Sequence, residues 1–154
     1  MTQDATKPRQ YDLVVVGRTG VPALAVEIKA LRQTSAGWAA LTRRNLAVHD
    51  FLLPAAYFLF VAGDQMYLWE GPSALSPEPV PPDAVADSLT ILSPYYERSH
   101  LDPATTRGSA FELVVFAWIA DLTDGLGGPV PGDPAWQRML DAIRAGRATF
   151  EYAP

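Results

Sequence analysis

The sequence contains no cysteine among its 154 residues. This absence excludes disulfide bonds and thiolate metal sites. It is also what a reducing compartment favours, so we expect a cytoplasmic protein. The two histidines, His49 and His100, are isolated in the sequence, and we expect them to be structural or surface residues.

Long apolar runs and a secretory signal are also lacking. The longest apolar stretches, 51–62 and 111–120, are too short to cross a bilayer, and residues 1–10 are polar. We therefore expect no membrane segment, a flexible tail over residues 1–10 and a single domain over residues 11–154. Hydrophobic residues make up 49% of the chain, which is enough to build a core.

Positive charge is scarce, with 12 lysines and arginines against 17 aspartates and glutamates and a net charge of −5. General nucleic-acid binders usually carry a basic excess, so this balance counts against that class. It does not exclude an enzyme with a local basic patch, because the local field matters more than the total charge.

Two short apolar segments near the N-terminus predict a β-hairpin. Residues 11–16 (YDLVVV) are rich in valine, which favours a strand, and the glycines of residues 17–20 supply a turn. Residues 23–29 (ALAVEIK) then alternate, which places Glu27 and Lys29 on the face opposite the larger apolar side chains.

A helix and a second hairpin are predicted next. Residues 36–50 have helical periodicity, and Pro54 lies beyond their end. The apolar residues of this segment predict a buried stripe made of Trp38, Leu41, Val48 and Leu52. Residues 55–62 and 65–69 flank Gly63-Asp64, which indicates a hairpin whose first strand is covered on both faces.

The C-terminal half predicts a loop, a short element and two helices. Five prolines between residues 71 and 83 indicate an extended surface loop, and a short element over 84–92 should end at Ser93-Pro94. Ser109 and Glu112 have capping-box spacing ahead of an apolar run to about residue 122.

That run is apolar nearly all round, so the 109–122 helix is either central to the core or shared with a partner, which motivates a homodimer or protein-partner hypothesis. Asp133-Pro134 begins the last helix, with Trp136, Leu140 and Ile143 as its apolar stripe and Gly146 at its end.

One group of residues suggests chemistry. Glu27 and Lys29 share a strand face, and Asp12 near the start of the preceding strand can lie across from them if the two strands pair. Two carboxylates repel each other, and a divalent cation removes that repulsion. Mg²⁺ prefers oxygen ligands and keeps water molecules, a combination that suits phosphodiester hydrolysis. We see no Ser/His/Asp set for acyl transfer.

These segments resemble the core motif of the PD-(D/E)xK restriction-endonuclease-like superfamily. In that family a strand-borne aspartate precedes an acid-x-lysine on the neighbouring strand, which Asp12, Glu27 and Lys29 match. The predicted helix and second hairpin follow in the order of the αβββαβ core, and the segments LSPYYERSHL and FELVVFAWIADL extend the resemblance over most of the chain. The resemblance implies an α/β fold with a central mixed sheet flanked by helices.

The resemblance also implies the roles of the site residues. Asp12, Glu27 and the backbone carbonyl of Ile28 would hold Mg²⁺ or Mn²⁺, and Lys29 would position water or stabilise the transition state. Gln33, four residues after the lysine, falls where some members place a polar active-site residue. The expected activity is metal-dependent hydrolysis of nucleic acid, with DNA or RNA left open.

Two departures from the family pattern keep other interpretations open. Tyr11 replaces the usual proline, and Asp4 is the sole acid upstream, where the family usually has one on a helix. An alternative is therefore a catalytically inactive module of the same fold that serves interaction or assembly. A third is an α/β domain of unrelated function.

Three further residues have competing roles. Arg43 and Arg44 either contact phosphates or form the solvated side of their helix. Glu112 either replaces the missing acid or only caps its helix.

Overall fold

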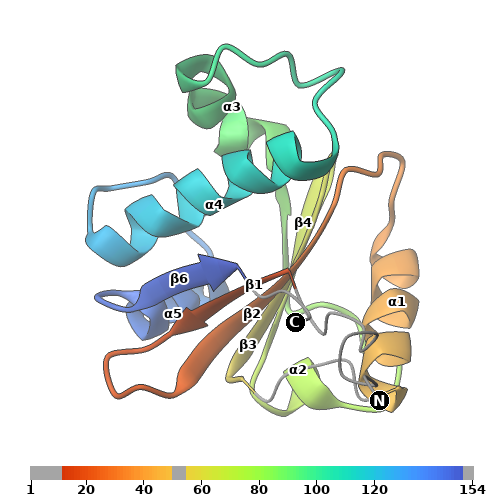
Figure 1. Ribbon diagram of the computed structural model, residues 1–154. Coiled ribbons are helices and arrows are strands. Elements are labelled where there is room, and N and C mark those ends of the chain that lie inside the picture. The colour runs from red at the N-terminus through yellow and green to blue at the C-terminus, as the bar shows by residue number, and fades with distance from the viewer. Residues whose placement is uncertain (1–11, 50–54, 151–154) are drawn as a thin grey trace, which may run out of the picture.

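The structure, a computed structural model, describes residues 12–49 and 55–150. The tail predicted over residues 1–10 lies outside these residues, as do Tyr11 and Leu52. Six strands form one mixed sheet in the order β5-β4-β3-β2-β1-β6. Helices flank the sheet, as expected for an α/β fold (Figure 1).

The first hairpin forms as predicted. Strand β1 (Leu13–Val16) pairs antiparallel with β2 (Pro22–Lys29), with Leu13 opposite Val26 and Val14 opposite Ala25. The turn between them is closed by a hydrogen bond from Gly17 N to Val21 O. Val-rich segments pack well on a pleated surface, which explains why so short a strand as β1 forms here.

A crossover helix joins β2 to a parallel neighbour. Helix α1 (Ala36–Val48) connects β2 to β3 (Tyr57–Ala62), and the two strands pair in parallel with Ile28 opposite Val61. Strand β4 (Gln65–Glu70) then pairs antiparallel with β3 through the tight turn at Gly63 and Asp64. Residues 58–62 of β3 are all buried, which confirms the prediction of a strand covered on both faces.

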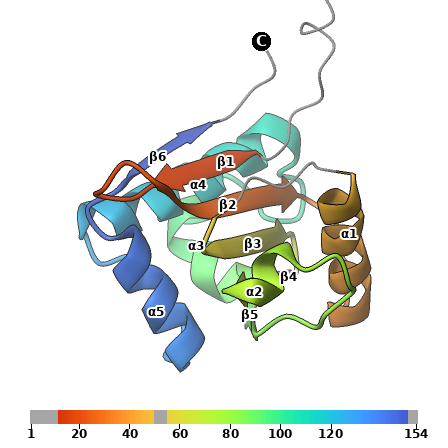
Figure 2. The same cartoon turned by 90° about the horizontal axis from the view of Figure 1, so that it is seen from below.

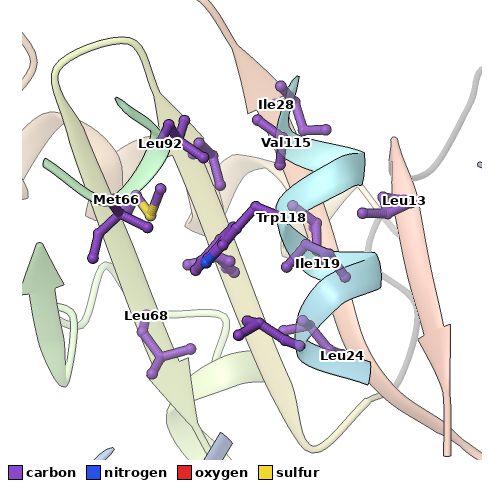
Figure 3. Close-up of a cluster of buried hydrophobic side chains, with 14 of the residues drawn as sticks. Leu13, Leu24, Ile28, Met66, Leu68, Leu92, Val115, Trp118 and Ile119 are labelled. Carbon is purple, nitrogen blue, oxygen red and sulfur yellow. The ribbon is translucent and has the colours of Figure 1, made fainter. Parts of the chain in front are cut away.

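One face of the sheet is covered by helices from the C-terminal half. These are α3 (Ser88–Arg98), α4 (Gly108–Asp124) and α5 (Pro134–Ile143), and their buried residues form one cluster with Leu24, Val26 and Ile28. Trp118 of α4 lies at the centre of this cluster (Figure 3). The alternation predicted for β2 is therefore confirmed, because its larger apolar residues all face this side.

The prediction for the helix over 109–122 is resolved in favour of the core. Its residues Phe111, Val114, Val115, Trp118, Ile119 and Leu122 are buried against the sheet. Leu113 is 59% exposed and is the large apolar residue that this helix leaves to solvent. The predicted capping box is wrong, because the helix begins at Gly108 with Arg107 as its N-cap, which places Ser109 inside the first turn.

The opposite face is covered by α1 and the short helix α2 (Pro72–Leu75), which lie across the sheet from α4 (Figure 1). The buried stripe predicted for α1 is confirmed at Trp38, whose ring packs against Phe60, but it is wrong at Leu41 and Val48, which are 52% and 45% exposed. The buried residues are Ala39, Ala40 and Arg43. The sheet face beneath the helix is filled by large aromatic residues, against which the two alanines and the Arg43 side chain pack: Phe58, Phe60, Tyr67 and Trp69.

The proline-rich segment is more ordered than an extended loop. It contains α2, and its later part is held by a hydrogen bond from Trp69 Nε1 to Val80 O at 3.0 Å. Strand β5 (Ala84–Asp87) follows, and α3 continues through Pro94 instead of ending before it. Asp87 caps α3 by accepting from Leu89 N at 3.0 Å, which with the buried side chains of α3 offsets the cost of an internal proline.

The last strand was not predicted. Strand β6 (Arg147–Phe150) pairs antiparallel with β1, with Val16 opposite Arg147 and Val14 opposite Thr149. It has four residues with weak alternation, so its extended form depends on the β1 edge that it joins.

The contact between α3 and α4 predicts an alkaline sensitivity. Tyr95 donates its hydroxyl hydrogen to Asp121 Oδ2 at 2.8 Å, and burial, followed by this carboxylate, raises the pKa of Tyr95 to about 12. The unfolded chain loses this proton near pH 10, so the free energy of unfolding should fall as pH rises from about 10 towards 12. In Tyr95→Phe this part of the decline should disappear, as measured by urea unfolding at pH 8 and pH 11. An equal decline in both proteins would contradict the assignment.

Candidate functional site

The start of β1 and the end of β2 lie at one end of the sheet, beside α1 (Figure 2). Asp12 immediately precedes β1 and is 8% exposed. Its carboxylate Oδ2 accepts a hydrogen bond from Ile28 N at 2.7 Å, and its own N–H donates to Val26 O at 3.0 Å. Side chain and main chain therefore both attach Asp12 to the segment of β2 that contains the acid-x-lysine motif.

Glu27 and Lys29 form the second pair of this site. Lys29 Nζ lies 3.4 Å from Glu27 Oε2, and Glu27 is 9% exposed while the lysine side chain is 47% exposed. The two residues share the face of β2 that holds Ala25, which packs in the cluster beneath α1. A partly solvated ion pair adds little to the stability of the fold.

The hydrogen bond of Asp12 and the Glu27–Lys29 ion pair both involve residues 27–29 of β2. Ile28, whose N–H binds Asp12, lies between Glu27 and Lys29. The ammonium group of Lys29 compensates part of the negative charge at this site. The arrangement is thus a pair of buried carboxylates beside one exposed amine.

Gln33 lies in the loop after β2 and has an exposed side chain with a φ of 60°. A left-handed conformation costs a residue other than glycine roughly 1–2 kcal/mol. The neighbours impose it: Leu31 O accepts from Gly63 N at 2.7 Å, and Thr34 N donates to Asp64 Oδ2 at 2.9 Å. The loop carrying Gln33 is therefore fixed at both sides to the turn between β3 and β4.

That turn also contains a polar cluster that no sequence pattern indicates. Thr34 Oγ1 donates to Asp64 Oδ1 at 2.7 Å and lies 2.7 Å from the hydroxyl of Tyr67. Burial raises the pKa of Tyr67, so the phenol stays protonated at neutral pH. Gly63-Asp64 indicated only a turn, because a turn aspartate gives no sign of a partner thirty residues earlier.

Of the alternative candidates, Arg43 is the clearest correction, because it is neither solvated nor placed for a phosphate. Its side chain is fully buried, and it donates to the carbonyls of Ala74 and Glu78. Arg44 is partly buried, with Nη1 3.4 Å from Asn45 Oδ1. Arg43 therefore acts within the described structure.

The remaining candidates are His49, His100 and Glu112. His49 and His100 are exposed, and His100 has a φ of 57°. Glu112 lies in the first turns of α4. Within residues 12–49 and 55–150, no three histidine, cysteine or acidic side chains are grouped closely enough to hold a metal ion.

Comparisons with known proteins do not identify a family, because no family model, curated protein or solved structure matches this chain. In the part of the chain that the structure describes, no helix is both long enough and apolar enough to span a bilayer.

Proposed function

We propose that this chain is a Mg²⁺-dependent nuclease-like domain of the PD-(D/E)xK type, which hydrolyses phosphodiester bonds of nucleic acid. The observation that supports this most directly is the hydrogen bond from Ile28 N to Asp12 Oδ2 at 2.7 Å. It joins the aspartate of the first strand to the residue between Glu27 and Lys29. The crossover through α1 to a parallel strand also agrees with the order of elements that the resemblance implies.

The donor set fits a hard divalent cation. Mg²⁺ takes oxygen ligands and uses only one or two carboxylates, as Asp12 and Glu27 would supply. A carboxylate offers about four acceptor positions, so the bond from Ile28 does not prevent Asp12 from acting as a ligand. In an antiparallel pair the N–H and C=O of a residue face the same neighbour. The Ile28 carbonyl therefore lies on the side of Asp12 and suits the role of third ligand.

Each residue of the site has its own expected role. When bound, the cation would supply activation of water and compensation of charge on a phosphate. Lys29, with its exposed ammonium group, would contact a phosphate oxygen or orient the attacking water. Glu27 holds that ammonium group at 3.4 Å, and Gln33 is presented by its fixed loop towards solvent.

A plasmid-cleavage assay with Mg²⁺ or Mn²⁺ tests this function. We expect the wild type to cut, Lys29→Ala to lose about 10²–10³-fold in rate and Arg144→Ala to keep the wild-type rate, because a transition-state contact is worth that factor. Arg144 is an exposed cation on another element and controls for net charge. Equal rates in wild type and Lys29→Ala, or no cutting by either, would contradict the proposal.

The second candidate is the inactive module of the same fold. It is favoured by the mutual satisfaction of the polar groups, since Lys29 pairs with Glu27 and Asp12 caps the N–H of Ile28. In that case the cluster would serve only to hold the end of β2. The partner, whether a second copy or another protein, stays a prediction.

A further inference from the structure

A second polar site lies at the other end of the first hairpin. A hollow of about 640 Å³ opens there between the β1–β2 turn and the segment that leads from α5 into β6. Arg18, Arg147 and Thr149 contribute its polar side chains, and none of the described residues that line it is acidic. The sequence of this region predicts only a turn and a helix end.

The backbone bend after α5 shapes this hollow. Ala145 has a φ of 64°, and its N–H donates to Thr123 O at 2.9 Å, which fixes the bend after α5. A Cβ at Gly146 would lie 2.5 Å from Val16 O, so only glycine lets the bend approach β1 this closely. Arg147 is thereby set directly opposite Val16, at the rim of the hollow.

The two guanidinium groups at this hollow have no acidic partner in the part of the chain that the structure describes. Among the described residues, neither Arg18 nor Arg147 forms an ion pair or a side-chain hydrogen bond. Most other described cations do interact: Arg98, Arg138 and Arg144 pair with acids, Lys29 pairs with Glu27, and Arg32 and Arg43 bind carbonyls. In a chain of net charge −5, these two arginines, at a hollow whose described lining has no acid, form a local basic patch.

The patch shares a sheet face with Glu27. Val14 pairs with Ala25 on one side and with Thr149 on the other, and directly paired residues project to the same face. Arg147 and Glu27 are each two residues further along their strands, so they also lie on this face. With about 3.3 Å per residue along a strand and about 4.8 Å between strands, the patch lies roughly 15 Å from the carboxylates.

We propose that Arg18 and Arg147 form a phosphate-binding subsite that holds the backbone of a nucleic acid whose scissile bond lies at Asp12 and Glu27. This inference rests on the proposed function for the position of the scissile bond. Arginine presents a planar fork of donors that matches phosphate oxygens, and Thr149 adds a hydroxyl group. The separation of roughly 15 Å corresponds to a few nucleotides, since one strand of a duplex advances about 3.4 Å per residue along the axis.

Fluorescence anisotropy with a labelled 20-nucleotide DNA, as single strand and as duplex, tests the subsite with Ca²⁺ in place of Mg²⁺. The test protein is Arg18→Gln/Arg147→Gln, and the control is Arg98→Gln/Arg144→Gln, which removes the same charge from outside the hollow. We expect the test variant to bind about 10-fold more weakly at every DNA sequence and its salt dependence, as the slope of log K against log salt, to fall by roughly 1–2. The control should bind DNA like the wild type, because Arg98 and Arg144 pair with acidic residues of the chain.

The outcomes separate this inference from the proposed function. An equal loss in both double variants, or no DNA binding by wild type at low salt, would overturn the subsite. Loss of DNA binding in the test variant without any cleavage by wild type would support the subsite and contradict the nuclease. If the test variant binds and cleaves DNA as the wild type does, the nuclease is supported and the subsite is contradicted. If inorganic phosphate, but not DNA, protects the wild type against thermal unfolding relative to chloride, the hollow takes a small anion and the nucleic-acid assignment is wrong.

Discussion

Asp12→Asn is expected to abolish metal-dependent cleavage while leaving the fold intact. The amide oxygen of the new side chain still accepts the hydrogen bond from Ile28 N, whereas the negative charge that a cation requires is gone. We expect a rate loss on the order of 10²–10³-fold or more, which is the size observed when one charge-stabilising group is removed. Isothermal titration with Mn²⁺ should likewise lose its binding heat.

Asp12→Ala is the matched comparison. It removes both the charge and the cap on Ile28 N, so it should lose the same activity and also about 1–3 kcal/mol of stability, the cost of leaving a buried N–H unsatisfied. If Asp12 only holds the strand, Asp12→Asn will keep the wild-type melting temperature and any wild-type metal binding. That pattern would remove the aspartate from the proposed site and leave the inactive module as the better interpretation.

Arg43→Ala should be among the most destabilising single changes at a polar residue in this chain. The guanidinium group is fully buried, donates to Ala74 O at 3.2 Å and to Glu78 O at 2.5 Å, and lies 5.7 Å from the ring centroid of Trp69. Burial lowers the pKa of Arg43 from its ordinary value, but an arginine stays charged in a protein. The two carbonyls belong to the proline-rich segment, so this side chain attaches that segment to α1.

The expected cost of Arg43→Ala is about 3 kcal/mol, from the lost charged hydrogen bonds and the cavity left behind. At this chain length that corresponds to roughly 6–12 °C in melting temperature. Arg44→Ala, one position along and partly exposed, should shift the melting temperature little. Equal shifts in the two variants, measured by thermal circular dichroism, would show that the buried contacts are not the cause.

Arg43→Met separates the two contributions to this effect. Methionine keeps much of the volume and avoids a buried charge, so it should recover part of the loss. Full recovery would mean that packing alone matters, and no recovery would mean that the carbonyls need a donor.

Local patterns were sufficient where one face of a strand is buried. The alternation of residues 23–29 determines which side chains of β2 face α4, and the glycine turns place the two hairpins with small errors at their ends. The same alternation keeps Glu27 and Lys29 together on one face, as the ion pair at 3.4 Å bears out.

Local sequence patterns failed where burial or pairing depends on the surface against which an element packs. The spacing of Leu41 predicts a buried position. The helix instead buries Ala39, Ala40 and Arg43 against the aromatic residues of β3 and β4. Strand β6 and the polar partners of Asp64 also escaped, because each depends on residues far away in the sequence.

The sequence by itself determined the α/β class, the two hairpins and the shared face of Glu27 and Lys29, because side-chain period and turn chemistry are local properties of the chain. Only the tertiary structure decided which face of α1 is buried, that β6 completes the sheet and that Arg18 and Arg147 meet at one hollow. These depend on contacts between distant segments, whose geometry no local pattern contains.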